Sequence, residues 1–235
     1  MVRNISVTSV VDAVVEDFKA LVLAREVSPG ASVTENDLAQ RYDIARATAK
    51  AAIERLVNDK VLNRRNHKTA RVVSLGPADV RDIYNARLCL ESEVLRRLAR
   101  SQGDWSECRQ ANAEIRALWA EGVWDITLPD LRFHTSLVAA SNSSRLTSIY
   151  ASLACEVRLC LSQLQGAQRL SPEIIVAEHA KLLDLVESGD GEGAARLLDE
   201  HLSRARELLA GSLGGVSGPE AFMPSSALAE LSQPA

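Results

Sequence analysis

The sequence predicts a mainly α-helical protein in which an N-terminal winged helix-turn-helix precedes an all-α antiparallel helical bundle. Three observations predict this class. Aromatic residues make up only 4% of the 235 residues, and the abundant alanine and leucine favour helices packed on helices. Residues 1–75 combine short helical and strand-like patterns with a net positive charge. From Gly76-Pro77 onward the apolar spacing is helical almost throughout.

The composition excludes several classes of protein. With 46% hydrophobic and 25% charged residues, the chain resembles ordinary globular proteins rather than disordered or fibrous ones. Asp12, Glu16 and Asp17 interrupt the apolar segment near the N-terminus, which predicts neither a transmembrane helix nor a signal peptide. The four cysteines are scattered without a CxxC pair, as expected for reduced thiols. We therefore expect a cytoplasmic protein without a membrane partner.

The first elements form a helix-turn-helix pattern. Apolar residues at spacings of three and four predict a helix over 7–26. Thr34, followed three residues later by Asp37, predicts a capped short helix that ends at Tyr42-Asp43. A second helix is expected over 45–58.

Two short strands are expected next, over 61–65 and 70–73, around the polar turn 66–69. Such a ribbon after a helix-turn-helix is a wing, and it completes a domain over 1–75.

The remainder of the chain predicts six helices and a tail. Their starts are signalled by residues that cap helices or favour the first turn. The expected ranges are 78–101, 104–121, 127–141, 144–165, 171–188 and 190–211. They would form a bundle over 76–212, followed by a flexible tail over 213–235 that is rich in Gly, Ser and Pro.

Charge separates the two parts of the chain. Residues 1–75 hold 12 basic and 9 acidic residues, whereas the rest holds 15 and 22, so the N-terminal part is positive and the C-terminal part negative. Nine basic and three acidic residues lie between Arg41 and Arg71. This density suits binding to phosphates, although a solvated basic face on a structural helical pair is the alternative.

The second helix of the predicted hairpin has the pattern of a recognition helix. If Ile44, Ala49, Ile53 and Leu56 face inward, Arg46 and Lys50 lie one turn apart on the outer face. Basic side chains there can donate to guanine in the major groove of double-stranded DNA, while the wing reaches phosphates or the minor groove. The candidate DNA contacts are Arg41, Arg46, Thr48, Lys50, Arg64, Arg65, His67 and Lys68.

Three of the four histidines lie in the predicted bundle. Asp130 and His134 are four residues apart and share a helix face, and His179 and His201 lie in two later helices that a bundle would bring alongside. One carboxylate and three imidazoles suit Zn²⁺, Ni²⁺ or Mn²⁺ with coordination positions left open. The alternative is that these histidines are polar residues satisfied by their neighbours.

The N-terminal residues resemble a known family. The stretch from Val33 to Arg46, continued by residues 50–56, is similar to the DNA-binding domain of the GntR family. Arg46 matches the family's DNA-contacting arginine. Three positions depart from the pattern: Ala45 replaces a serine that caps the helix, Lys50 replaces a second arginine, and Thr69 replaces a common wing glycine. The operator sequence therefore cannot be copied from relatives.

The C-terminal residues resemble the FadR C-terminal (FCD) branch of this family. Asp130–His134 is similar to its Asp-x-x-Phe-His motif, and Ala140-Ser141-Asn142 to the residues that follow it. Glu178-His179, Gly189-Asp190 and 199–202 resemble its later histidine motifs. Six helices are more similar to the shorter, VanR-like version than to the seven-helix one.

This resemblance implies a regulator controlled by a ligand. It implies one divalent ion per subunit, held by Asp130, His134, His179 and His201, with a small organic or sugar acid as effector beside it. Arg87 and Glu91 match an Arg-x-x-Leu-Glu motif, so Arg87 is expected either to meet the effector or to form an ion pair with Glu91. Those two residues and Asn142 are the candidate effector contacts.

The expected protein is a homodimeric repressor that binds a palindromic operator, with a hinge at Gly76-Pro77.

Two rival functions remain open on the sequence. A metal-dependent hydrolase or hydratase could use the same Asp/His₃ site, since a metal can activate water. Glu178 adjoins His179, but neighbours on a helix point about 100° apart, so no general base is evident. The second rival is a helical interaction protein with structural histidines.

Overall fold

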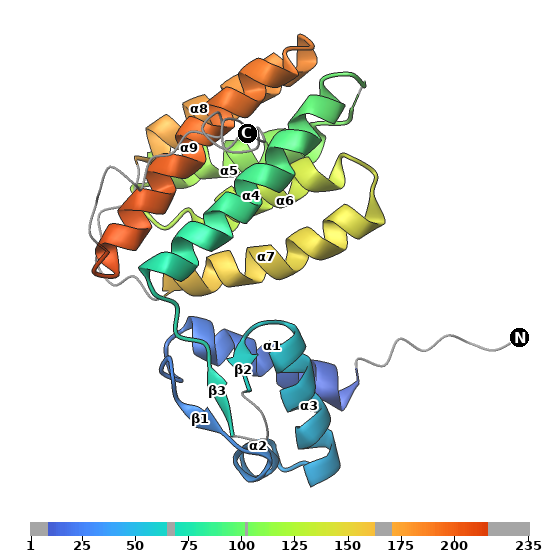
Figure 1. The fold of residues 1–235 in the computed structure, drawn as a ribbon, viewed down its shortest axis with the longest axis vertical. Helices are drawn as coiled ribbons and strands as arrows, with labels where there is room; N and C mark the ends of the chain where they lie inside the picture. Colours follow the sequence, from blue (N-terminus) through green and yellow to red (C-terminus); the bar gives the residue numbers. More distant parts are fainter. Residues whose placement is uncertain (1–8, 65–68, 102, 163–170, 216–235) are drawn as a thin grey trace, which may run out of the picture. The chain divides into compact units, whose positions relative to one another are not determined.

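The computed structural model describes residues 9–64, 69–101, 103–162 and 171–215 (Figure 1). These residues form two compact units, one from 1–75 with 152–165 and the other from 76–151 with 166–235, where described. The predicted wing residues Arg65, His67 and Lys68 and most of the predicted tail lie outside the described residues.

The first unit contains the expected helix-turn-helix and wing. Its elements are α1 (Val10–Leu23), β1 (Ser32–Val33), α2 (Glu35–Tyr42), α3 (Arg46–Asn58), β2 (Leu62–Asn63) and β3 (Ala70–Val72). Both α1 and α2 pack on α3. The strands form an antiparallel sheet in the order β1-β3-β2, with Val33 opposite Ala70 and Leu62 opposite Val72.

Local side chains set the limits of these helices. Ser9 is extended and its hydroxyl accepts from the Asp12 amide, so α1 begins at Val10 and is shorter than the predicted range. The capping box predicted at the start of α2 is present: Thr34 accepts from the Asp37 amide, and Asp37 accepts from the Thr34 amide. Asp43 ends α2 in the left-handed region at φ 50°, which makes the turn into α3 tight.

The sequence analysis did not predict β1. It has only two residues, too few for an alternating pattern, and only its pairing with β3 makes it a strand. Val33 is buried in the apolar core of this unit, together with Leu38, Ile53 and Leu56. The guanidinium of Arg71 on β3 also donates to the Gly30 carbonyl (2.9 Å), just before β1.

The described residues after Gly76 contain the six helices that the sequence predicts, all in the second unit except that α7 from residue 152 onward belongs to the first. They are α4 (Pro77–Leu98), α5 (Ser106–Ala120), α6 (Thr127–Ala139), α7 (Ser144–Ser162), α8 (Pro172–Glu187) and α9 (Gly191–Ser212). Helix α5 packs on α6 and α8, and α4 contacts α6, α8 and α9. Among the described residues, no helix combines the length and the apolar character that crossing a membrane requires.

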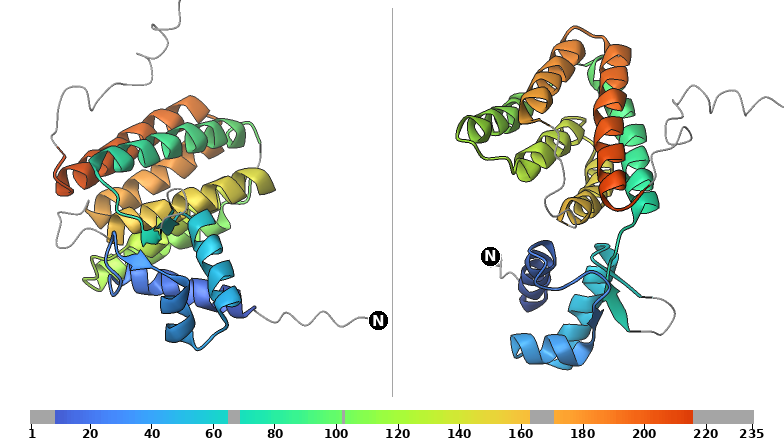
Figure 2. Two further views of the ribbon diagram at one scale, coloured as in Figure 1. Left: turned by 60° about the horizontal axis from the view of Figure 1, so that its bottom comes forward. Right: turned by 90° about the vertical axis from the view of Figure 1, so that its left-hand side faces the viewer.

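Helices α4 and α9 lie side by side in both views of Figure 2. They run antiparallel, because Gly191 at the start of α9 meets Arg96 near the end of α4, and Arg206 donates to Asn85 (2.7 Å) nearer its start. A Cβ atom on Gly191 would lie 2.9 Å from the Arg96 Cα, so this approach requires glycine. The two contacts fix the register of α9 on α4.

Candidate functional site

Helix α3 presents the basic face that the sequence predicts. Ala49, Ile53 and Leu56 are fully buried, while Arg46 and Lys50 are exposed. Of the other candidate DNA contacts, Arg41 and Arg64 are exposed and Thr48 is partly buried.

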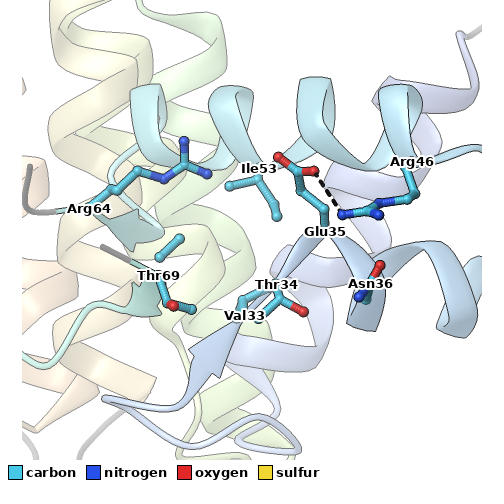
Figure 3. A pocket seen from close by; sticks show the side chains of 9 residues that line it. Val33, Thr34, Glu35, Asn36, Arg46, Ile53, Arg64 and Thr69 are labelled. Carbon is cyan, nitrogen blue, oxygen red and sulfur yellow. Dashed lines mark ion pairs between the residues drawn. The ribbon is translucent and has the colours of Figure 1, made fainter. Parts of the chain in front are cut away.

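A pocket of about 330 Å³ opens beside the start of α3 (Figure 3). It lies between α2, α3 and the wing strands, and it is lined by Val33, Thr34, Glu35, Asn36, Arg46, Ile53, Arg64, Thr69 and Ala70. Arg46 and Arg64 come from α3 and from the residue after β2, so both parts of the predicted DNA-binding face contribute to it.

The four predicted metal ligands come together in the second unit. Asp130 and His134 lie on α6, His179 on α8 and His201 on α9. Each offers one ligand atom, and these atoms all lie within 4.8 Å of one another. The three imidazoles are buried, and the Nε2 atom of His179 lies 3.5 Å from Oδ1 of Asp130.

Several atoms of this cluster lack a hydrogen-bond partner among the described residues. They are Oδ1 of Asp130, Nε2 of His134 and both ring nitrogens of His179. Burying polar atoms without a partner costs free energy, and buried polar groups in proteins are nearly always satisfied. A cation within reach of these atoms satisfies the carboxylate oxygen and the imidazole lone pairs together, so the residues present fit a metal ion.

Two glutamates orient two of the imidazoles. Nδ1 of His134 lies 2.6 Å from Oε2 of Glu91, and Nδ1 of His201 lies 2.8 Å from Oε2 of Glu178. Each carboxylate accepts the Nδ1–H and so fixes the tautomer in which Nε2 carries the lone pair. Such carboxylate–histidine pairs are usual around metal ligands.

The surroundings of His134 and His179 favour their neutral forms, and those of Glu91 favour its ionised form. Burial lowers the pKa of His134, and burial together with the neighbouring imidazoles lowers the pKa of His179 well below its usual value. Burial alone would raise the pKa of Glu91, but His134 and the Arg87 guanidinium outweigh it and bring that pKa to about 2. Neutral imidazoles are the form that binds a metal.

Arg87 forms the ion pair with Glu91 that the sequence analysis gave as one of its two possible roles. Its Nε donates to Glu91 (3.0 Å), and its buried Nη2 has no partner among the described residues. Glu91 also accepts from the hydroxyl of Tyr150 (2.6 Å), so its carboxylate is engaged by three side chains. Asn142 is exposed in the turn after α6 at φ 51°, a conformation that asparagine tolerates; its contact with an effector stays a prediction.

The sequence analysis missed two members of this network. Tyr150 lies 59 residues from Glu91, and no local pattern links them. Glu178 was named as part of the Glu178-His179 motif and weighed as a general base for a hydrolase, but not as a partner of His201. Its oxygens are instead held by His201 and Arg204, both on α9.

Two stretches of the chain match known families. Residues 10–72 match the family described as bacterial regulatory proteins, gntR family, and residues 82–204 match the FCD domain. The chain is 26% identical over 205 residues to the probable D-xylose utilization operon transcriptional repressor of Paenarthrobacter nicotinovorans, covering 86% of this chain and 90% of that protein. It is 21% identical over 185 residues to the transcriptional repressor RspR of Escherichia coli, covering 77% and 80%.

Solved structures share the fold. A GntR transcriptional regulator of Rhodococcus sp. RHA1 superposes with a TM-score of 0.72 at 22% identity, over 86% of this chain and 97% of that one. McbR/YncC of E. coli gives 0.67 at 19% identity, over 86% and 98%. With its helix-turn-helix, its helical domain and both family matches, the chain belongs to the GntR family of DNA-binding transcriptional regulators, in the branch with an FCD domain, and is not an enzyme.

Proposed function

We propose that this regulator is a homodimeric repressor that binds a palindromic operator and is controlled by a small anionic effector at a divalent metal ion in its FCD domain. One observation carries the proposal: the ligand atoms of Asp130, His134, His179 and His201 converge in a buried cluster and several lack other partners. The proposed domains are those expected from the sequence, 1–75 for DNA and 76–212 for metal, effector and dimerisation.

Four side chains would hold the ion, which is Zn²⁺, Ni²⁺ or Mn²⁺ by the chemistry of the donors. Asp130 supplies an oxygen and the three histidines supply nitrogens. When bound, the ion supplies positive charge and open coordination positions for the oxygens of an anion. Glu91 and Glu178 keep the rings of His134 and His201 in the ligating tautomer.

The proposed effector is a small organic or sugar acid. The C-terminal part of the chain is acidic overall, so an anion needs local positive charge, and the unpaired Nη2 of Arg87 provides a buried donor for a carboxylate. The names of two relatives concern sugar metabolism: the D-xylose repressor, and the gluconate operon repressor of Bacillus licheniformis, 23% identical over 142 residues that cover 58% of this chain and 57% of that protein.

DNA binding is assigned to α3 and the wing. Arg46 and Lys50 would reach bases in the major groove, and Arg64 would contact phosphate. Replacing Arg46 by alanine should cost about 1–3 kcal/mol of discrimination between sequences. Selection of genomic fragments by the purified protein tests this assignment. Failure to enrich a palindrome would contradict it.

The control by effector is tested in two steps. Organic and sugar acids are screened for a thermal shift of the metal-loaded protein, and operator affinity is then titrated with each acid that binds. We expect a 5- to 150-fold change in affinity, the range of about 1–3 kcal/mol that such couplings span. The His179→Ala protein should lose both the metal and the response. An acid that binds the metal-loaded protein but leaves operator affinity unchanged would contradict the proposal.

A further inference from the structure

Glu35 supplies the one carboxylate among the described residues that line the pocket beside α3, which also include Arg46 and Arg64. Glu35 is the first residue of α2 and Arg46 the first of α3, and their Oε2 and Nη2 atoms are 3.9 Å apart. Figure 3 shows the two side chains pointing toward one another, with Arg64 on the opposite side of the pocket. A negative charge at this position repels DNA phosphates. Its presence beside Arg46 therefore calls for an explanation.

Helix α3 gives Arg46 little support of its own. Ala45, at the N-cap, makes no side-chain hydrogen bond, and the first turn of α3 contains no acidic residue. The backbone of Glu35, by contrast, is fixed by the capping box of Thr34 and Asp37, and the left-handed Asp43 sets the path from α2 to α3. The carboxylate that Arg46 meets therefore comes from the neighbouring helix.

This ion pair adds little to folding stability. The Arg46 side chain is 70% exposed and that of Glu35 is 34% exposed, and exposed pairs are weak in water. The pair matters for the geometry of the guanidinium, which has donors on more than one edge. An arginine held by a carboxylate at one edge can direct another edge to the O6 and N7 atoms of guanine. The same carboxylate repels phosphates whatever the base sequence.

We propose that Glu35 is a positioning residue that holds Arg46 for guanine and disfavours its contact with phosphate. The assignment rests on the proposed binding of DNA through α3. It predicts that Glu35 lowers affinity for DNA in general while raising the preference for the operator.

Glu35→Gln removes the charge and keeps the shape. Binding is measured at one salt concentration to the selected operator and to a scrambled duplex of equal length. The variant should bind the scrambled duplex as tightly as the wild type or more tightly, and the ratio of operator to scrambled affinity should fall about 2- to 10-fold.

Two further proteins make the test specific. In an Arg46→Ala background, Glu35→Gln should leave the ratio unchanged, because Glu35 acts through Arg46. Glu26→Gln removes the same charge from an exposed position in the turn after α1 and should also leave the ratio unchanged.

The outcomes separate this assignment from the proposed function. If Glu35→Gln tightens binding to both duplexes equally, Glu35 only contributes charge and the assignment is wrong. A change of ratio that persists without Arg46 also overturns it. If the wild-type protein enriches no sequence at all, the proposed function fails and the assignment fails with it.

Discussion

Glu178 connects His201, one of the four proposed metal ligands, to the surface of α9. One carboxylate oxygen accepts from Nδ1 of His201 and the other pairs with Arg204, so the glutamate is fixed at both ends. Loss of such a partner typically weakens metal binding 10- to 100-fold. We expect Glu178→Ala to lower metal affinity by roughly that factor, measured by competition with a chromophoric chelator.

The matched control is Glu173→Ala, an exposed glutamate in the first turn of the same helix. Its metal affinity should equal that of the wild type. Equal affinity in the Glu178→Ala protein would show that His201 needs no partner.

The buried imidazoles should make the metal-free protein sensitive to acid. The pKa values of His134 and His179 are lowered in the folded state, whereas in the unfolded chain a histidine titrates near 6.5. Below about pH 6.5 these two histidines are protonated in the unfolded chain but stay neutral in the folded chain. The free energy of unfolding therefore falls as the pH falls.

Urea denaturation with a chelator present at pH 7.5 and 5.5 measures this difference. Each group contributes at most about 1.4 kcal/mol per pH unit. His179→Gln should reduce the dependence. Equal free energies at both pH values in the wild type would refute the explanation. The lowered pKa of Glu91 acts at more acidic pH, because an unfolded glutamate titrates near 4.3.

At the residue scale, the motif resemblance predicted which four side chains meet, and the structure brings them together. Their orientation could not be predicted. The ring of His134 is held by Glu91, 43 residues away, and Glu91 is held by Tyr150 on another helix. Such contacts depend on how α4, α6 and α7 pack, which helical periodicity alone does not fix.

At the element scale, α3 begins with an unused capping position. Ala45 has φ −62° and ψ 144°, the extended conformation in which a serine hydroxyl can accept an amide of the first turn. Ala45→Ser should therefore raise the free energy of unfolding by about 0.5–2 kcal/mol, measured by chemical denaturation. Ala45→Thr should also stabilise the protein, since threonine caps helices too. If the serine variant is no more stable than the wild type, the backbone amides in the first turn of α3 already have hydrogen-bond partners.

The helices were more predictable than the sheet. Each helix of the described chain is long enough for its apolar spacing and start signals to be read, and errors were confined to the ends, as for α1. The strand β1 consists of Ser32–Val33 and exists because β3 pairs with it. The grouping of residues 152–165 with the first unit likewise arises from contacts between distant segments and was not anticipated.

For the whole molecule, coupling between effector and DNA must be reciprocal. If an acid changes operator affinity by some factor, the operator must change the affinity for that acid by the same factor. Isothermal titration of the acid into the metal-loaded protein, with and without saturating operator, measures this second factor. Unequal factors would mean that the acid also acts elsewhere on the protein. A scrambled duplex serves as the control.

The close approach of Gly191 to Arg96 has a consequence for His201, which lies further along the same helix. His201 follows Gly191 by ten residues, about 15 Å along α9 at 1.5 Å per residue. The contact at residue 191, which has no side chain, therefore determines where along α4 helix α9 places His201. A larger residue at position 191 should shift or tilt α9 against α4 and move His201 away from Asp130, His134 and His179. The geometry of the proposed metal site therefore depends on residue 191, which is not one of its four proposed ligands.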